Sequence, residues 1–381
     1  AVEIAKATTD ETAALELWRG ILKVKGANQS LRSALPEKSL SEATVKAGMR
    51  VAREGGRDDI DLVVAFAKAG GLNADTAALS GEVIKELATK AGSKGNPTRG
   101  EAVYRRSELN CVTCHAIGGA GGKVGPDLMS IGASAPADYI VEALLLPSAK
   151  IKEGYPSINI DTKDDQSISG TLARETPEEV VLRTATGAEV NVAKQNIASR
   201  QNGTISLMPT GLLDNLDERD KLDLIAFLSS LGKPGEFDAS KSGVARSWRV
   251  YPLTHTDQQN GVVEGIWKKP LTDKMWQPTF AQVNGRLTRE QLEAKAKQDF
   301  WVGILQVFAA TELQTVKAGA VKLNLEATAG EVWIDEKKLG GLGESVVELP
   351  AGTHRVLVKI DPKNVPEFIR LRTSEGVFSN N

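Results

Sequence analysis

Residues 110–119 read NCVTCHAIGG and contain the two cysteines of the chain, Cys111 and Cys114, with His115 directly after the second. This spacing has four chemical interpretations: a disulfide, half of a zinc site, a redox pair, or the attachment point of a covalent haem. The choice among them decides which fold we expect around the motif and which chemistry the chain supports.

Three of these interpretations fit poorly. A disulfide across two intervening residues would close a very short loop and stabilise little. Zinc needs four thiolate or imidazole ligands, yet the other histidines, His255 and His354, lie far along the chain. A thioredoxin-like pair is expected at a helix start after a strand, whereas here we expect a helical stretch with the glycine-rich loop 118–125 behind it. C-x-x-C-H is the attachment motif of haem c, because one helical turn can present two sulfurs and an imidazole to one macrocycle.

The second axial ligand has four candidates among the methionines. Met49 belongs to a helical region and Met275 to a strand-rich one. Met208 lies in SLMPTGL, on an extended segment just before a helical pattern, so it can reach over a haem. Met129 follows His115 by only fourteen positions, and we expect it to pack against the haem edge. We therefore predict His115 and Met208 as the axial ligands.

Hydrophobic periodicity divides the rest of the chain into a multidomain α+β protein. Residues 1–95 show repeated amphipathic helical patterns, with Asp10 as an expected N-cap, and predict a helical, repeat-like domain. From about 157 to 200 the period changes to two, with turn signals at 164–165 and 186–187. A helical stripe returns at 217–232. The polar segments 93–100 and 233–243 are the expected linkers.

Residues 244–381 are rich in alternating strand patterns and predict an antiparallel β-sandwich. Val321, Leu323 and Leu325 are expected on one inward face, as are the alternate residues 356, 358 and 360. Five tryptophans fall in this part of the chain, and we expect most of them to be core residues rather than platforms for sugar rings. They are Trp248, Trp267, Trp276, Trp301 and Trp333.

Composition excludes some classes of function. The 381 residues are 41% hydrophobic, and 47 basic residues against 49 acidic ones leave a net charge of −2. We therefore expect no nucleic acid and no anionic membrane as the main partner. No run approaches the roughly 18 apolar residues of a membrane span. The chain begins AVEIAKATTD, without Met or a signal-like apolar segment, so we expect a processed form or a fragment of a longer protein.

The motifs resemble those of class I c-type cytochromes: Gly100 and Tyr104 in a leading helix, CVTCH at 111–115, GPDL at 125–128, MP at 208–209, and the final helix LDLIAFLSSLG. The stretches KVGPDLMSIG, YIVEALLLPSAKIKEGY, SISGTL and SLMPTGL are similar to the Pirellula/Verrucomicrobium-type haem-binding domain family. The resemblance covers about 97–233 and implies a cytochrome c domain with a β-rich insertion.

The resemblance also implies roles for individual residues. His115 is the expected proximal ligand and Met208 the distal one, and the Pro126 carbonyl is expected to accept the other ring N–H of His115. Gly100, Tyr104 and the helix with Phe227 and Leu228 are expected to close the haem pocket by cross-packing. Family members carry the haem unit at the C-terminal end of larger proteins, whereas this chain continues for some 150 residues.

In function, the resemblance implies an electron-transfer protein with one covalent haem c, working outside the bacterial cytoplasm in the periplasm. A dehydrogenase of sugar or alcohol oxidation is the expected donor, and a cytochrome or oxidase the acceptor. We expect an electron-transfer module rather than an enzyme by itself. One alternative is a haem enzyme or gas sensor with a labile sixth ligand.

The second alternative concerns the last domain. Its stretches LNLEATAGEVWIDEKKLGG and LPAGTHRVLVKID resemble PA14 and carbohydrate-binding sandwiches. This resemblance implies a polysaccharide-binding protein with a tethered electron carrier, and a carbohydrate ligand for the domain. A structural or docking module is the other interpretation, since a fold does not define a ligand.

Overall fold

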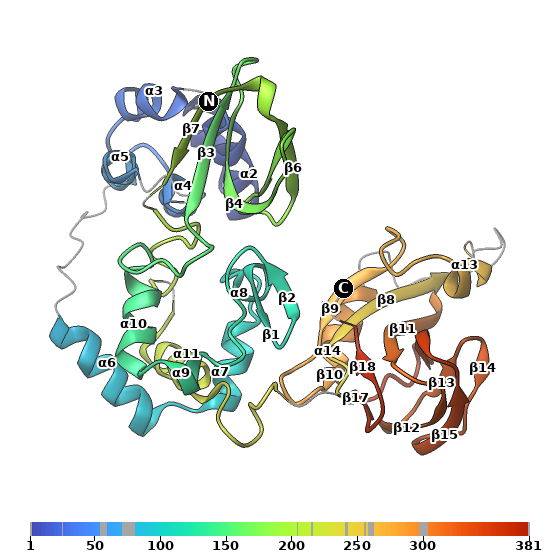
Figure 1. Ribbon diagram of the computed structural model, residues 1–381. Helices are drawn as coiled ribbons and strands as arrows, with labels where there is room; N and C mark the ends of the chain where they lie inside the picture. The colour runs from blue at the N-terminus through green and yellow to red at the C-terminus, as the bar shows by residue number, and fades with distance from the viewer. Residues whose placement is uncertain are drawn as a thin grey trace. The chain divides into compact units, whose positions relative to one another are not determined.

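The computed structural model describes residues 2–24, 26–53, 59–70, 81–203, 205–214, 216–240, 243–254, 257, 263–296 and 304–379. It is a mixed α and β protein with several antiparallel sheets (Figure 1). Two compact units divide the chain. The first comprises Ala1–Ala116, Gly122–Pro126 and Ile131–Ser230, and the second comprises Ile117–Gly121, Asp127–Ser130 and Leu231–Asn381. His255 and Trp301 lie outside the described residues.

Five helices at the start of the first unit share one hydrophobic core. Trp18 lies at its centre, where its indole N–H donates to the Thr44 carbonyl at 3.0 Å and its ring meets Phe66 edge-on at 4.9 Å. The predicted cap is confirmed, since the Asp10 carboxylate accepts the Ala13 N–H at 2.8 Å. The helices are α1 (Val2–Ala7), α2 (Glu11–Leu22), α3 (Ala27–Ala34), α4 (Glu42–Arg53) and α5 (Ile60–Gly70).

The described part of the first unit holds six further helices, one of which, α8 (Cys111–Cys114), is the CVTC turn of the motif. The others are α6 (Gly81–Lys94), α7 (Pro97–Tyr104), α9 (Ile131–Ser134), α10 (Ala137–Leu145) and α11 (Glu218–Ser230). The predicted stripe is buried, with Leu222, Ile225 and Leu228 of α11 and Leu231 just after it at most 6% exposed. We expected α6 within the helical domain 1–95. It packs instead against α10 and α11, so its apolar side is covered by the helices around the motif.

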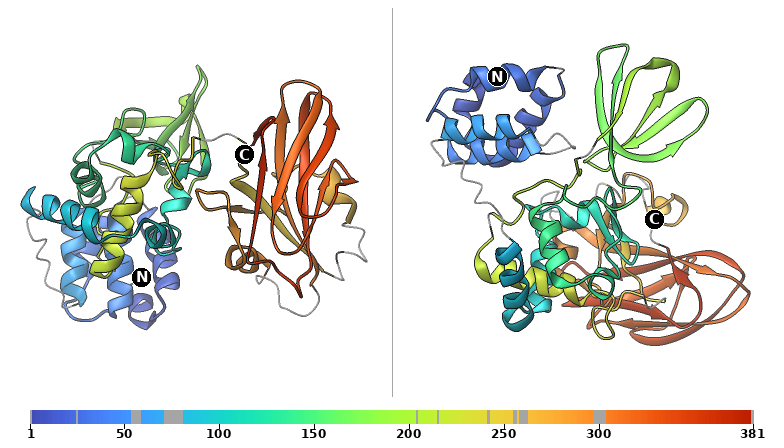
Figure 2. Two further views of the ribbon diagram at one scale, coloured as in Figure 1. Left: turned by 90° about the horizontal axis from the view of Figure 1, so that it is seen from below. Right: turned by 60° about the vertical axis from the view of Figure 1, so that its left-hand side comes forward.

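A five-stranded antiparallel sheet occupies the place of the predicted β insertion (Figure 2). Its strands are β3 (Ser157–Thr162), β4 (Ser167–Glu175), β5 (Glu179–Arg183), β6 (Glu189–Ala193) and β7 (Ile197–Asn202), in the order β6-β5-β4-β3-β7. Both predicted turns are present, with Asp165 and Gly187 at positive φ. The buried face holds Ile158, Ile160, Val180, Leu182 and Val192.

The second unit holds two antiparallel sheets, of seven and four described strands, that contribute to one core. Strands β14-β13-β16-β11-β8-β9, with β18 beside β11, form the first sheet, and β10-β17-β12-β15 form the second. The residues predicted to face inward on β12 and β16 are buried, as Leu323 and Val358 illustrate at 1% and 0% exposure. This arrangement is compatible with a sandwich.

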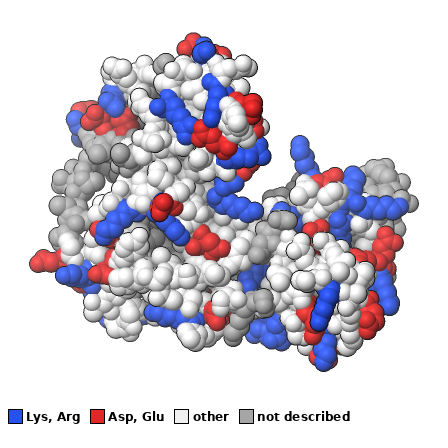
Figure 3. Space-filling model, viewed as in Figure 1, with Lys and Arg blue, Asp and Glu red and all other residues white. Residues whose placement is uncertain are grey.

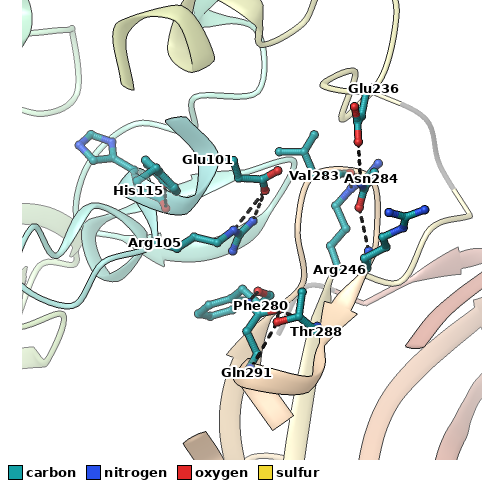
Figure 4. Close-up of polar contacts among 12 residues, drawn as sticks. Glu101, Arg105, His115, Glu236, Arg246, Phe280, Val283, Asn284, Thr288 and Gln291 are labelled. Carbon is teal, nitrogen blue, oxygen red and sulfur yellow. Dashed lines mark hydrogen bonds and ion pairs between the residues drawn. The ribbon is translucent and has the colours of Figure 1, made fainter. Parts of the chain in front are cut away.

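The elements of this unit are β8 (Ser247–Thr254), β9 (Gln277–Phe280), β10 (Leu287–Thr288), β11 (Ile304–Thr315), β12 (Gly319–Glu326), β13 (Glu331–Ile334), β14 (Lys337–Lys338), β15 (Gly343–Leu349), β16 (Gly352–Ile360), β17 (Phe368–Thr373), β18 (Val377–Phe378), and helices α13 (Val263–Lys268) and α14 (Arg289–Ala296). Trp248 and Trp276 are buried, as expected of core tryptophans. Trp267 and Trp333 are half-buried. Side-chain bonds close its loops, from Asn284 to Glu236 and from Gln291 to the Phe280 carbonyl (Figure 4).

The surface carries charges of both signs. Lys and Arg side chains lie among Asp and Glu side chains on the face in Figure 3, as the net charge of −2 leads one to expect. Among the described residues, none of the helices has the length and apolar character needed to cross a membrane.

Candidate functional site

The CVTCH motif forms a single helical turn at residues 111–114, and His115 follows it in an extended conformation. Asn110, in the left-handed region at φ 54°, precedes the turn α8, and His115 follows it with φ −114° and ψ 133°. The Gly125 N–H donates to the Cys114 carbonyl at 2.8 Å, which holds the end of the turn. The local structure therefore presents two sulfurs and one imidazole from five consecutive residues.

Both cysteine side chains are thiols rather than a disulfide. Burial raises the pKa of the Cys111 thiol to about 12, and the neighbouring Cys114 adds to the effect. The Cys111 Sγ lies 3.9 Å from the Leu109 carbonyl, to which it donates. Nucleophilic cysteines need a lowered pKa, because the thiolate is the reactive form. A half-buried thiol with a raised pKa does not match a redox pair.

The imidazole of His115 is held on two sides. Its Nδ1 lies 2.8 Å from the Pro126 carbonyl, the contact expected from the resemblance. A carbonyl only accepts, so Nδ1 carries the proton of the neutral ring and Nε2 is the nitrogen with a lone pair. A Cβ at Gly125 would lie 2.4 Å from Cε1 of the ring, so only glycine leaves room for it there. The ring is thereby fixed in tautomer and in place.

The backbone of His115 is also fixed. The Tyr104 hydroxyl, on a side chain 2% exposed, donates to the His115 carbonyl at 2.9 Å. Tyr104 lies at the end of α7, and its ring meets Phe227 of α11 at 5.6 Å between centroids. The cross-packing expected between these helices is present.

Glycine makes the crossing of α7 and α11 close. A Cβ at Gly100 would lie 1.9 Å from the Asp223 carbonyl oxygen and 2.7 Å from the Phe227 Cβ. The Asp223 carboxylate accepts the Asn96 N–H at 2.6 Å and two N–H groups of Arg99 at 2.6 and 2.9 Å. Burial raises the pKa of Asp223, but these hydrogen bonds outweigh it and hold the pKa below its ordinary value.

An ion pair between α7 and its C-cap residue lies next to this crossing. The Arg105 side chain donates to the Glu101 carboxylate at 2.7 Å, and both side chains are largely buried (Figure 4). The residues lie four positions apart, so they share one face of the helix. A second pair joins the segment just after α7 to α11, because Arg106 donates to the Asp220 carboxylate at 2.6 Å.

The glycine-rich stretch after His115 is a hairpin rather than the loop that we expected. Strands β1 (His115–Ile117) and β2 (Ala120–Lys123) pair across Gly118 and Gly119, both at positive φ. A Cβ at Gly122 would lie 1.7 Å from the Thr113 carbonyl, so β2 runs directly against the backbone of α8. Close backbone approach explains the glycines better than loop flexibility does.

Met208 lies in the segment between β7 and α11, where hydrogen bonds hold residues 205–208. The Met208 N–H donates to the Ser206 hydroxyl at 3.1 Å, and the Ser206 N–H donates to the Ser148 hydroxyl at 3.1 Å. The Ser157 hydroxyl holds the Ile205 carbonyl at 2.7 Å. The half-buried Met208 is thus on a constrained segment, and its position opposite His115 stays a prediction.

The other methionines are engaged elsewhere. Met49 packs against the core of helices α1–α5. Met275 packs on a separate hydrophobic cluster of the second unit, beside Trp276. Met129 is half-buried, and its N–H donates to the Asp127 carboxylate at 2.8 Å. Within the described residues, no three or more His, Cys, Asp or Glu side chains gather in a way that could hold a metal ion.

Two residues that touch this region were not predicted from the sequence. Arg183, at the end of β5, donates to the Lys123 carbonyl at 2.9 Å and pairs with Glu189. Asp127 accepts backbone N–H groups of the hairpin. An aspartate that follows Gly-Pro and a Gly-Gly pair is a signal that sequence reasoning could have used. Arg183 carries no such signal, since sixty positions separate it from its partner.

Comparisons with known proteins give no family for this chain and some weak structural similarities. Family models give no match to the sequence, and neither do the curated proteins. An anti-sigma factor domain-containing protein from Clostridium clariflavum is similar over 36% of this chain and 44% of its own, at 9% identity and TM-score 0.20. A second anti-sigma factor domain-containing protein is similar over 58% and 74%, at 12% identity and TM-score 0.20. The chain spans less than half the length of the first, and these scores carry no argument about fold.

Proposed function

We propose that this protein is an electron-transfer c-type cytochrome with one covalent haem c. Cys111 and Cys114 would hold the group by thioether bonds, and His115 and Met208 would be its axial ligands. The observation that carries the proposal is the 2.8 Å contact from His115 Nδ1 to the Pro126 carbonyl, directly after a one-turn C-x-x-C helix. This contact directs Nε2 to be the ligand nitrogen.

The residues present fit the group. Gly125 leaves a cradle for the imidazole that any Cβ would fill. Cys111 and Cys114 are both free thiols, the groups that would form thioether bonds to a haem. Tyr104 fixes the backbone carbonyl of the ligand residue. Each of these features supports a site in which the histidine is held rigidly.

The bound haem would supply reversible one-electron oxidation and reduction of iron, with methionine ligation raising the potential. The chain contributes positioning. Pro126 keeps the proton on Nδ1 of His115, so that the ring does not turn or change tautomer. The helix crossing at Gly100 and the buried Tyr104 keep the end of α7 against α11. A rigid ligand set keeps reorganisation on electron transfer small.

The partners and location follow from this proposal. Covalent attachment of haem takes place outside the bacterial cytoplasm, so the protein would work in the periplasm or on an outer membrane face. The donor would be a dehydrogenase of sugar or alcohol oxidation, and the acceptor a cytochrome or oxidase. The protein would act as a module or subunit of such a system rather than as an enzyme by itself.

The absorption spectrum of the protein, produced where haem attachment takes place, tests the proposal. We expect haem absorbance that survives denaturation and acid–acetone extraction, and that is lost in Cys111→Ser/Cys114→Ser. A low-spin reduced spectrum without response to carbon monoxide supports His115 and Met208 as ligands. A high-spin spectrum that shifts with carbon monoxide would instead indicate a haem enzyme or gas sensor. Protein without covalent haem from a competent host would overturn the proposal.

A further inference from the structure

The carboxylate of Asp127 collects three backbone N–H groups from two segments. It accepts Gly118 N–H at 3.0 Å and Met129 N–H at 2.8 Å on Oδ1, and Gly119 N–H at 2.7 Å on Oδ2. Gly118 and Gly119 have φ of 62° and 79°. Consecutive N–H groups converge on one anion when the backbone adopts such conformations. The hairpin tip is thus shaped around this carboxylate.

Asp127 directly follows the residue that holds His115. The peptide group between Pro126 and Asp127 carries the carbonyl that accepts the His115 Nδ1–H at 2.8 Å. The direction of that carbonyl depends on ψ of residue 126 and φ of residue 127. Proline has its φ fixed by its ring but leaves ψ free to turn. An anchor on the side chain of residue 127 therefore limits the remaining rotation of the carbonyl.

We infer that Asp127 is a positioning residue for His115, acting through the Pro126 carbonyl to fix the tautomer and electron donation of the imidazole. The inference rests on the proposed function for its effect on the haem, but the effect on the tautomer stands without it. The Asp127 side chain is exposed, so it does not contribute to packing of a hydrophobic core. Its three bonds all restrain the two segments that flank the hydrogen bond to His115.

Two substitutions separate geometry from charge. Asp127→Glu keeps the negative charge but displaces the carboxylate by one methylene, which breaks the fit to all three N–H groups. Asp127→Asn removes the charge, and its single oxygen can still accept Gly118 and Met129, while its NH₂ faces the Gly119 N–H. Asp214→Asn is the charge control, because Asp214 is an exposed carboxylate elsewhere in the sequence-predicted cytochrome region.

The first readout is the ¹⁵N NMR spectrum of the His115 ring in protein without haem, at a pH where the imidazole is neutral. The parent protein is expected to show the Nδ1–H form. In Asp127→Glu we expect the ratio of Nδ1–H to Nε2–H to fall at least tenfold, with a smaller fall in Asp127→Asn and none in Asp214→Asn. An unchanged ratio in Asp127→Glu would overturn the inference.

The second readout is the reduction potential of the haem-loaded protein. Loss of the polarising hydrogen bond weakens electron donation by His115 and favours the reduced form. We expect Asp127→Glu to raise the ratio of reduced to oxidised protein about tenfold at a fixed potential, which is a shift of about 59 mV for one electron. A shift in Asp127→Asn with none in Asp127→Glu would show a charge effect alone and overturn the inference. Absence of haem would defeat the proposed function, while the NMR result would still decide the role of Asp127.

Discussion

Gly125→Ala tests how tightly the chain closes around His115. The Cβ of alanine would lie 2.4 Å from Cε1 and 2.7 Å from Nδ1 of the ring. Carbon atoms in contact stand about 3.5–4.0 Å apart, so the imidazole must retreat by roughly 1 Å. Its hydrogen bond to the Pro126 carbonyl is 2.8 Å long and is lost beyond about 3.2 Å. The substitution therefore removes the contact that fixes the His115 ring.

The magnitude follows from two contributions. Overpacking a filled site costs about 1–3 kcal/mol, and the lost hydrogen bond adds about 1 kcal/mol. We expect the free energy of unfolding to fall by about 2–4 kcal/mol, measured by urea titration with circular dichroism on protein without haem. The φ of Gly125 is not positive, so the effect is steric and not conformational.

Gly92→Ala is the matched control for this substitution. Gly92 lies in α6, and a Cβ there would meet no heavy atom within 4 Å. Alanine in an exposed helical position is expected to raise stability by about 0.5–1 kcal/mol. If Gly125→Ala behaves like Gly92→Ala, and the His115 ring keeps its Nδ1–H form, then the ring is not enclosed as described and the reasoning fails.

Three further predictions concern the crossing of α7 with α11 and the distal ligand. Gly100→Ala should cost about 3 kcal/mol in urea unfolding, because the Cβ would collide with the Asp223 carbonyl at 1.9 Å, and backbone cannot yield as a side chain can. Asp223→Asn should lower the free energy of unfolding by about 2 kcal/mol near neutral pH. The Asp223 carboxylate is buried, but its partner Arg99 is half exposed, so solvent weakens the ion pair. The folded pKa of Asp223 is lowered, so this loss should be full above about pH 4 and shrink as pH falls through the folded pKa, as stability curves against pH will show. Met208→Ala should change the reduced protein from no detectable to stoichiometric binding of carbon monoxide; an unaltered spectrum would exclude Met208 as the ligand.

Sequence patterns predicted local structure correctly where a hydrophobic period fits one kind of secondary structure. The alternation at 157–200 predicted strands, and the structure has a sheet with strands at 157–202. A period of two fits only an extended chain with one buried face. The stripe at 217–232 led to α11 for the corresponding reason. The hydrogen bond from His115 to Pro126 followed from the resemblance of short motifs rather than from periodicity.

What the patterns did not predict is which partner an element finds. Helix α6 shows an amphipathic pattern like those of α2 and α4, yet it packs against α10 and α11. Periodicity identifies the side of a helix that must be buried, but it does not identify the partner, because any apolar stripe can pack against any other. The glycine-rich hairpin was missed for a related reason. Glycine permits both a loop and a close approach of two backbones, and only the Thr113 carbonyl beside Gly122 distinguishes them.

The β insertion illustrates how a distant segment can bear on a local site. Arg183 donates to the Lys123 carbonyl at 2.9 Å, and a Cβ added at Gly187 would lie 3.9 Å from Cγ2 of the Val124 side chain. Residues 123 and 124 lead directly into Gly125 and Pro126, which enclose the imidazole of His115. The sheet thus braces the strand that precedes the cradle, while Asp127 anchors the segment that follows it. An insertion between the two expected ligands is for this reason part of the structure that holds His115, and its removal would free one side of the cradle.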